Sequence, residues 1–196
     1  MDVSASQGRA SASRGRVSAG DEALLRAARA GDREAFELIV HRHGPAMHNY
    51  ARRMLADAGD AQEVVQDAFV AAWRGLDHYR GESRLRTWLI SLTAHKAVDS
   101  YRRSRAVPVD DALLVPLASG PAQDPHVHAT QGEFLAALNG ALAELPHHQR
   151  ACWVLREVHG LSAAEVGKAL DLSPGAVRGQ VGRAQRALSE RMVRWR

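Results

Sequence analysis

The segment 161–191 has capping and turn residues where two short helices joined by a tight turn would need them. Ser162 is followed three positions later by Glu165, the capping-box pattern in which two polar groups satisfy each other's free amides at a helix start. Ser173 can cap a second helix, and Pro174 can take its first position, where no N–H is needed. The spacing predicts a helix-turn-helix, a motif whose second helix enters the major groove of DNA.

The second helix of this motif combines an apolar stripe with a cationic face. Its apolar residues recur at steps of four, three and four: Val177, Val181, Ala184 and Leu188. The side chains off that stripe are basic or amide: Arg178, Gln180, Arg183 and Arg186. Six arginines and one acidic residue between Ser173 and Arg196 give a local net charge of +5, which suits contact with phosphates. A helical hairpin with a solvated, arginine-rich face is the alternative interpretation.

The segment 79–103 places an aromatic side chain beside cations. For a helix from about Thr87, one face is apolar: Ile90, Ala94, Ala97, Val98 and Tyr101. The other face carries His95, Lys96, Asp99, Arg102 and Arg103. Trp88 among them could stack on the bases of a single strand, worth roughly 1–3 kcal/mol per base, or could close the edge of a helical domain. The loop before the helix could line a pocket for an extruded base with Tyr79, Arg80, Glu82 and Ser83.

No constellation for catalysis stands out. The chain lacks a phosphate-binding GxxxxGK[ST] loop and an HExxH motif. Its clustered histidines lack an acidic partner at metal-site spacing, and we expect them to be solvated: His41, His43, His48, His147 and His148. Cys152 is the only cysteine, which rules out an intrachain disulfide and favours a buried core thiol. We therefore expect no enzyme, no metal and no cofactor.

The elements that position these residues are helices throughout. Residues 1–20 are mostly Ser, Ala, Gly and Arg. They offer too little apolar surface to offset the entropy cost of ordering, and we expect a disordered tail. A helical pattern runs over 21–105 and again over 131–196. Between them, 106–130 holds four prolines, which break helices, and reads as a flexible linker. The expected fold is all-α, with two small helical domains joined by a proline-containing linker.

Within the first domain, the segment 60–74 reads as an amphipathic helix. Its apolar residues fall at steps of three and four: Ala61, Val64, Val65, Ala68, Phe69, Ala72 and Trp73. Its opposite face carries acidic and amide side chains with one arginine, namely Gln62, Glu63, Gln66, Asp67 and Arg74. This face is either simply solvated or a docking surface for a partner.

Composition and charge set broad limits on function. The 196 residues carry a formal net charge of +4, and only Lys96 and Lys168 among 26 basic residues are lysine. Arginine suits phosphate and guanine contacts, although a GC-rich genome would give the same bias. No apolar run approaches the roughly 20 residues of a bilayer span, and the N-terminus lacks the apolar middle of a signal peptide. The cytoplasm is the expected location.

Taken together, the two domains resemble the extracytoplasmic-function sigma factors, short members of the bacterial RNA polymerase sigma superfamily. The family's second region resembles AGDREAFELIVHRHGPAMHNYARRML and DAQEVVQDAFVAAWRGLDHYRGESRLRTWLISLTAHKAVDSYRR. Its fourth region resembles LAELPHHQRACWVLREVHGLSAAEVGKALDLSPGAVRGQVGRAQRAL. The order of the motifs and the proline-bearing linker agree with the family. The resemblance implies a transcription initiation factor that binds core polymerase and promoter DNA.

The resemblance also implies roles for particular residues. Docking on the clamp helices of the polymerase's largest subunit would fall to Asp60, Gln62, Glu63, Gln66 and Asp67. The minus-ten element would be recognised and opened by Tyr79, Arg80, Glu82, Ser83, Trp88, His95, Lys96, Asp99, Arg102 and Arg103. The minus-thirty-five element would be read as duplex by Ser173, Pro174, Gly175, Ala176, Arg178, Gly179, Gln180 and Arg183. Region four would also touch the polymerase flap, and an anti-sigma protein would regulate the factor.

The chain departs from many relatives at three positions, where His95 replaces Asn, Ala176 replaces Thr, and Gln180 replaces a basic residue. These changes suggest an altered promoter sequence. Two other functions stay open. The chain could be a stand-alone helix-turn-helix regulator, which would bind an operator without polymerase, or an adaptor that docks on polymerase without touching DNA.

Overall fold

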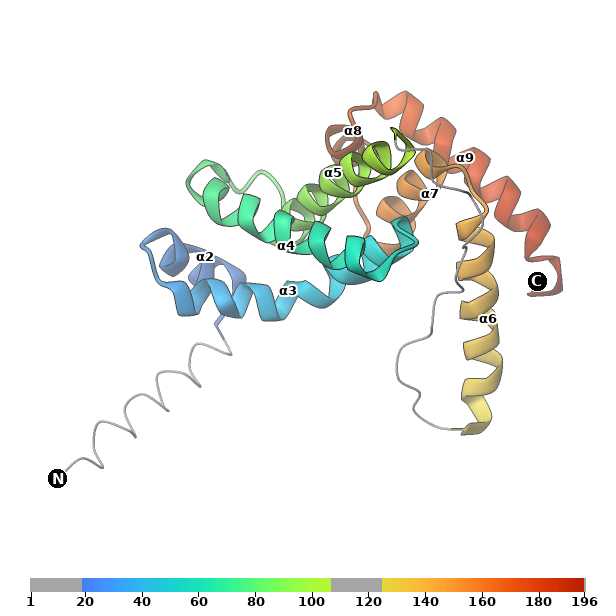
Figure 1. Ribbon diagram of the computed structural model, residues 1–196, viewed down its shortest axis with the longest axis horizontal. Coiled ribbons are helices and arrows are strands. Elements are labelled where there is room, and N and C mark those ends of the chain that lie inside the picture. Colours follow the sequence, from blue (N-terminus) through green and yellow to red (C-terminus); the bar gives the residue numbers. More distant parts are fainter. Residues whose placement is uncertain (1–18, 107–124, 196) are drawn as a thin grey trace.

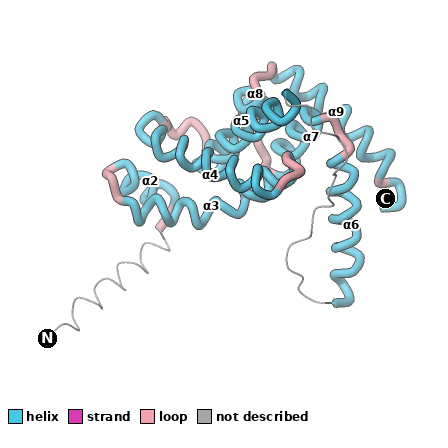
Figure 2. Tube along the Cα trace, viewed as in Figure 1, coloured by secondary structure: helices cyan, strands magenta, loops and turns pink. Residues whose placement is uncertain are grey.

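A computed structural model describes residues 19–106 and 125–195, and every regular element in those ranges is a helix (Figures 1 and 2). The first helical region has four α-helices and one short 3-10 turn. They are α2 (Asp21–Arg29), α3 (Arg33–Met54), α4 (Ala58–Gly75), η1 (Leu76–His78) and α5 (Leu85–Ala106). The predicted all-α class is confirmed.

Local chemistry sets where these helices begin. Asp32 caps α3 by accepting a hydrogen bond from the backbone N–H of Ala35 at 3.2 Å. Asp57 caps α4 in the same way, accepting from the N–H of Asp60 at 2.9 Å. The chain between α2 and α3 turns at Gly31, whose φ of 89° lies in the left-handed region that favours glycine.

The apolar face of each helix enters a shared core. In α5, the apolar face expected from the sequence is confirmed, with Ile90, Ala94, Ala97 and Val98 buried and Tyr101 half-buried. In α4, the stripe is buried along Ala61, Val64, Ala68 and Ala72, but Val65 and Phe69 are only half-buried. Trp73 on the same stripe is 37% exposed. The apolar surface of α4 is therefore wider than the face that the core covers.

The second helical region contains the helix-turn-helix. Its elements are α6 (Pro125–Ala143), α7 (His147–Trp153), the π-helical turn η2 (Val154–Val158), α8 (Ala163–Leu170), α9 (Pro174–Arg191) and η3 (Val193–Trp195). The helix α6 begins at Pro125, so residues 125–130 are helical although the sequence reads as linker there. Proline is tolerated at that place because the first turn of a helix needs no N–H from it. The tail 1–18 and the linker residues 107–124 lie outside the described residues.

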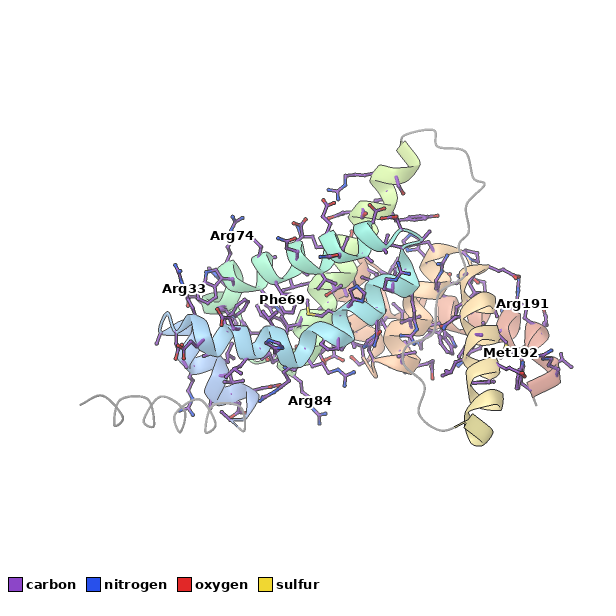
Figure 3. All side chains as sticks on the ribbon, turned by 60° about the horizontal axis from the view of Figure 1, so that its bottom comes forward. Arg33, Phe69, Arg74, Arg84, Arg191 and Met192 are labelled. Carbon is purple, nitrogen blue, oxygen red and sulfur yellow. The ribbon has the colours of Figure 1, made fainter. Side chains whose placement is uncertain are left out.

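The last turns of α9 are fixed to α6. Arg191 Nε donates to Glu144 Oε2 at 2.7 Å, and the rings of Phe134 and Trp195 meet edge to face with centroids 5.6 Å apart. Figure 3 shows Arg191 and Met192 close to α6 at this end of the molecule. The C-terminal turn η3 thus folds back toward α6.

The two helical regions pack against each other. Helix α8 lies against α5, and α3 contacts both α6 and α7. Arg150 of α7 donates to the backbone carbonyl of Arg53 in α3 at 3.2 Å. The buried apolar residues of both regions form one continuous hydrophobic cluster. Among the described residues, no helix is both long and apolar enough to cross a bilayer.

Candidate nucleic-acid interface

The loop between η1 and α5 is held by hydrogen bonds to its backbone. Tyr79, only 9% exposed, donates from its hydroxyl to the carbonyl of Ser83. Arg29 of α2 donates to the carbonyls of Leu76, at 2.9 Å, and of Tyr79. The loop turns at Gly81, where φ is 74°. Burial raises the pKa of Tyr79, which further favours the protonated hydroxyl that donates this hydrogen bond.

Trp88 is half-buried at the start of α5. Its ring lies 4.8 Å from the ring of Tyr79, tilted by 33°, and it also approaches Gly75 at the end of α4. The indole closes the domain edge on one side, as one interpretation expected, and faces a hollow on the other. Its stacking on the bases of a single strand stays a prediction.

This hollow, of about 430 Å³, brings together most of the residues predicted for the minus-ten surface. Six of them line it: Tyr79, Arg80, Glu82, Ser83, Trp88 and His95. The other four do not line it and continue along the outer side of α5: Lys96, Asp99, Arg102 and Arg103. Sequence reasoning missed the opposite wall, which comes from the second helical region through Glu165, Lys168 and Ala169 of α8.

The helix-turn-helix has the caps that the sequence predicts. The Ser162 hydroxyl accepts from the N–H of Glu165 at 3.2 Å, and the Glu165 carboxylate accepts from the N–H of Ser162 at 2.7 Å. Ser173 accepts from the N–H of Ala176 at 3.1 Å and starts α9. Between the helices, Asp171 adopts the left-handed conformation with φ of 55°.

Helix α9 buries its predicted stripe and exposes its polar face. The stripe residues Val177, Val181, Ala184 and Leu188 are buried. Of the residues predicted for the minus-thirty-five surface, six are exposed: Ser173, Pro174, Gly175, Ala176, Arg178 and Arg183. Gly179 and Gln180 are half-buried. No neighbouring side chain or backbone crowds Gly175, whose nearest atom to an added Cβ would be 3.9 Å away.

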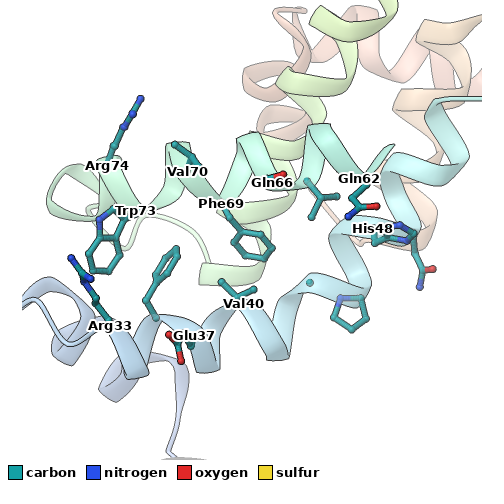
Figure 4. A pocket seen from close by; sticks show the side chains of 15 residues that line it. Arg33, Glu37, Val40, His48, Gln62, Gln66, Phe69, Val70, Trp73 and Arg74 are labelled. Atoms are coloured by element: carbon teal, nitrogen blue, oxygen red, sulfur yellow. The ribbon is translucent and has the colours of Figure 1, made fainter. Parts of the chain in front are cut away.

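A separate groove of about 1170 Å³ runs between α3 and α4 (Figure 4). Arg33 and Arg74 lie at one end with Trp73, and Gln62 and His48 lie at the other. Sequence reasoning missed its apolar wall, formed by Phe36, Val40, Val65, Phe69, Val70 and Trp73. The sequence signal for this groove was the apolar stripe of α4, which is wider than the face that the core covers.

The residues predicted to dock on polymerase divide between this groove and the neighbouring surface. Gln62 and Gln66 line the groove. Asp60 and Glu63 are exposed and Asp67 is half-buried on the rest of α4. A partner helix placed in the groove would thus meet an apolar wall with amides and carboxylates beside it.

Two of the histidines expected to be solvated are buried, contrary to that expectation. His43 is 6% exposed, and its Nε2 lies 3.2 Å from Asp21 Oδ2. His147 is 6% exposed and stacks on the ring of Tyr101 at 3.9 Å. Both were misread because sequence spacing does not reveal a partner from another helix. His41, His48 and His148 are exposed, and no group of three or more potential metal ligands occurs in the described residues.

Burial also shifts the titration of groups between the two regions. Burial, with Arg150, His148 and Arg102 nearby, lowers the pKa of His147 to about 4. Burial, with Arg86 and Arg53, lowers the pKa of His159 to about 4. Cys152 is a buried free thiol, and burial raises its pKa to about 11, which keeps it unreactive at neutral pH.

Two family profiles match the two helical regions. Sigma-70 region 2 matches residues 39–107, and Sigma-70 region 4 matches residues 135–188. The first covers the core of α3 to α5, and the second covers the helix-turn-helix. The fold and the site thus define a sigma factor of RNA polymerase.

Comparison with individual relatives shows which group of sigma factors the chain belongs to. The chain is 32% identical over 178 residues to the ECF RNA polymerase sigma factor SigM of Mycobacterium tuberculosis, which covers 89% of this chain and 86% of SigM. It is 34% identical over 176 residues to the sigma factor CnrH of Cupriavidus metallidurans, covering 86% and 92%. It is 31% identical over 180 residues to the sigma-E factor of Escherichia coli, covering 88% and 94%. The chain belongs to the extracytoplasmic-function sigma factors, which direct RNA polymerase to promoters.

Solved structures show the same fold. CnrH, in complex with the cytosolic domain of CnrY, superposes with a TM-score of 0.60 at 32% identity over 87% of this chain and 95% of that chain. RpoE of Bartonella quintana, in complex with the anti-sigma factor NepR, superposes with a TM-score of 0.61 at 22% identity, over 80% and 96%.

Proposed function

We propose that this sigma factor divides promoter recognition between its two helical regions. Helix α9 reads the minus-thirty-five element as duplex through Arg178, Gln180 and Arg183. The loop at Tyr79 and the outer side of α5 bind the opened minus-ten element. The observation that carries this division is the capped helix-turn-helix, which exposes Arg178 and Arg183 on α9 while burying its apolar stripe.

Core polymerase docks on the groove between α3 and α4. The clamp helices lay an apolar face against Phe69, Val70 and Trp73, and their polar residues meet the amide and carboxylate side chains of α4. The amount of exposed apolar surface supports this assignment, because Val70 is 43% exposed and Trp73 is 37% exposed, and grouped apolar surface marks interaction sites.

The protein performs no chemistry itself and acts in the cytoplasm, where the polymerase forms the phosphodiester bonds. An anti-sigma protein holds it inactive until a signal releases it. The complex of the related CnrH with the cytosolic domain of CnrY supports a protein partner of this kind. Pull-downs from unstressed cells test this part, and recovery of polymerase without any inhibitory protein would contradict it.

Run-off transcription tests the central proposal. Purified core polymerase is compared with and without the protein on a library of upstream regions from its own genome. New start sites that depend on the protein are the expected result, and their alignment gives both promoter elements. Retardation of duplex DNA by the protein alone, with no transcripts, would instead support a stand-alone regulator.

A further inference from the structure

Helix α2 contacts the chain at the point where it enters the loop 79–84, which the proposed function assigns to the minus-ten element. The last residue of α2, Arg29, donates from Nε to the carbonyl of Leu76 at 2.9 Å, and from a second guanidinium nitrogen to the carbonyl of Tyr79. Its guanidinium carbon lies 5.8 Å from the centroid of the Tyr79 ring. One side chain of α2 therefore holds both the start of η1 and the residue that follows it.

The carbonyls at the end of η1 need a donor of this kind. Carbonyls in the last turn of a helix have no N–H of the same helix to accept from. The Leu76 carbonyl accepts a long hydrogen bond of 3.3 Å from the N–H of Tyr79, which that N–H shares with Gly75. The planar guanidinium presents several N–H groups in a fixed fork, so it joins two carbonyls at once, which a lysine ammonium does less well. Arg29 thus fixes the direction in which the chain leaves η1.

The position of Tyr79 in turn sets the hollow proposed for the minus-ten element. The Tyr79 hydroxyl donates to the carbonyl of Ser83 at the far side of the loop. The Tyr79 ring lies 4.8 Å from the ring of Trp88 at the start of α5. All three residues line the hollow. A shift of the backbone at Tyr79 would therefore change the shape that the hollow offers to a base.

Helix α2 is itself anchored, so it can act as a fixed support. Its residues Leu24 and Ala28 are each 2% exposed. At its start, Asp21 lies 2.8 Å from an Arg42 nitrogen and 3.2 Å from His43 Nε2, both on α3. The helix is thus tied to α3 at one end and to the loop at the other. The Sigma-70 region 2 profile begins at residue 39, so α2 lies outside the range that it matches.

We propose that Arg29 is a positioning residue for minus-ten recognition, which holds the loop 79–84 in the shape that selects the bound base. This inference rests on the proposed function. Arg29 does not line the hollow and acts through Tyr79. Loss of Arg29 should therefore weaken the base preference at the minus-ten element. Reading of the minus-thirty-five element by α9 and docking of polymerase between α3 and α4 should persist, because Arg29 belongs to neither surface.

Run-off transcription on two promoter libraries tests the proposal, one randomised at the minus-ten element and the other at the minus-thirty-five element. Arg29→Ala is compared with Arg26→Ala, which removes an exposed arginine from the same helix. At a well-read position the preferred base commonly gains about tenfold over the others, and Arg29→Ala is expected to lower this gain at minus ten to about threefold or less. Arg29→Lys, which keeps the charge without the fork, should give an intermediate preference. Arg26→Ala should keep the full preference, and the minus-thirty-five preference should be the same in all variants.

Hydrogen exchange followed by mass spectrometry examines the loop without DNA. Peptides that cover residues 76–88 are expected to exchange faster in Arg29→Ala than in Arg26→Ala, while the rest of the first helical region exchanges at the same rate in both. This readout separates a local change in the loop from a general loss of stability.

Two results would overturn the proposal. In one, Arg29→Ala keeps the minus-ten preference of Arg26→Ala. In the other, Arg29→Ala loses both preferences equally and exchanges faster throughout the first region. If Arg29→Ala does not fold, the comparison is made with Arg29→Lys, and an unchanged minus-ten preference there contradicts the positioning role. Failure of the proposed function is seen separately in the unmodified chain, which then gives no dependent transcripts or no minus-ten preference, and the positioning role falls with it.

Discussion

In the proposed function, duplex recognition depends most directly on Arg178 and Arg183. Both are exposed on α9 and lie off its buried stripe. A lost bidentate base contact weakens discrimination by about 1–3 kcal/mol, so Arg178→Ala/Arg183→Ala is expected to lower run-off initiation by about tenfold or more. The unfolding curve should stay unchanged, because neither side chain is buried.

The matched comparison is between single substitutions, Arg178→Ala on α9 and the removal of one arginine at a distance from α9. Arg26→Ala takes an exposed cation from α2 and should leave initiation unchanged. Equal losses for the two proteins would mean that net charge, and not the face of α9, sets promoter binding.

Gly167 is required by the turn of the helix-turn-helix. A Cβ at this position would lie 2.5 Å from the carbonyl oxygen of Leu172, and the N–H of Leu172 donates to the carbonyl of Gly167 at 2.9 Å, which holds the two backbones together. Gly167→Ala is expected to destabilise the chain by about 1–3 kcal/mol, as overpacking does. Urea unfolding followed by circular dichroism measures the change.

Gly182→Ala is the control for this substitution. Its Cβ would meet nothing within 4 Å in the middle of α9, so alanine should leave stability unchanged or raise it by up to about 1 kcal/mol. A loss of stability at Gly182 equal to that at Gly167 would show that the effect is not the close approach to Leu172.

These residues also show what sequence reasoning can reach at this scale. The caps at Ser162 and Ser173 were predictable, because a capping residue acts on amides two or three positions along the chain. The need for glycine at 167 was not predicted, because it depends on the path of the turn that follows.

At the scale of the element, α4 shows why a helix that was correctly predicted from the sequence did not reveal the groove beside it. The periodicity predicted the helix and its apolar stripe, and Ala61, Val64, Ala68 and Ala72 are buried as expected. The periodicity of the apolar stripe does not show where the core ends, because that limit depends on how much of α4 is covered by α3. The uncovered edge at Phe69, Val70 and Trp73 became the wall of the groove.

The groove gives a prediction for polymerase binding. Val70 is 43% exposed, so Val70→Asp places a charge in the groove without disturbing the core. A carboxylate buried against the apolar wall would lose its hydration without gaining a partner, which costs several kcal/mol, so we expect binding to core polymerase to weaken by about tenfold or more. Co-elution with core at graded concentrations measures this.

Val193→Asp makes the same chemical change on η3, where Val193 is 59% exposed and lies outside the groove. Polymerase binding should be unaffected by it. Equal weakening by both substitutions would remove the groove from the proposed interface.

At the scale of the whole molecule, the sequence predicted two helical regions but not their packing. Contacts such as Tyr101 with His147 join residues that are far apart in the sequence, and no local pattern marks either as a partner of the other. Because local patterns do not reveal partners from distant segments, His43 and His147 were expected to be solvated although both are buried. Charge and periodicity describe one element at a time, while the packing of the two regions arises between elements.

The packing of the two helical regions against each other should depend on pH through two histidines. The pKa values of His147 and His159 are lowered from the ordinary 6.5 to about 4. The cations facing them are Arg150 and Arg102 at His147, and Arg53 and Arg86 at His159, with His148 beside the first. Separation of the regions would expose both imidazoles and return their pKa values toward 6.5.

The direction of the pH effect follows from the number of protons that each state binds. Between pH 6.5 and about 4, a state with separated regions binds more protons than the packed state, so lowering the pH favours separation. The contribution of these histidines to the packed state is fully present above pH 6.5. Small-angle X-ray scattering should show a radius of gyration that rises as the pH falls through this window, while circular dichroism shows that the helices persist. His147→Gln/His159→Gln should flatten this response, whereas the exposed His148→Gln should keep it. An unchanged response in the double variant would mean that other groups drive the separation of the regions.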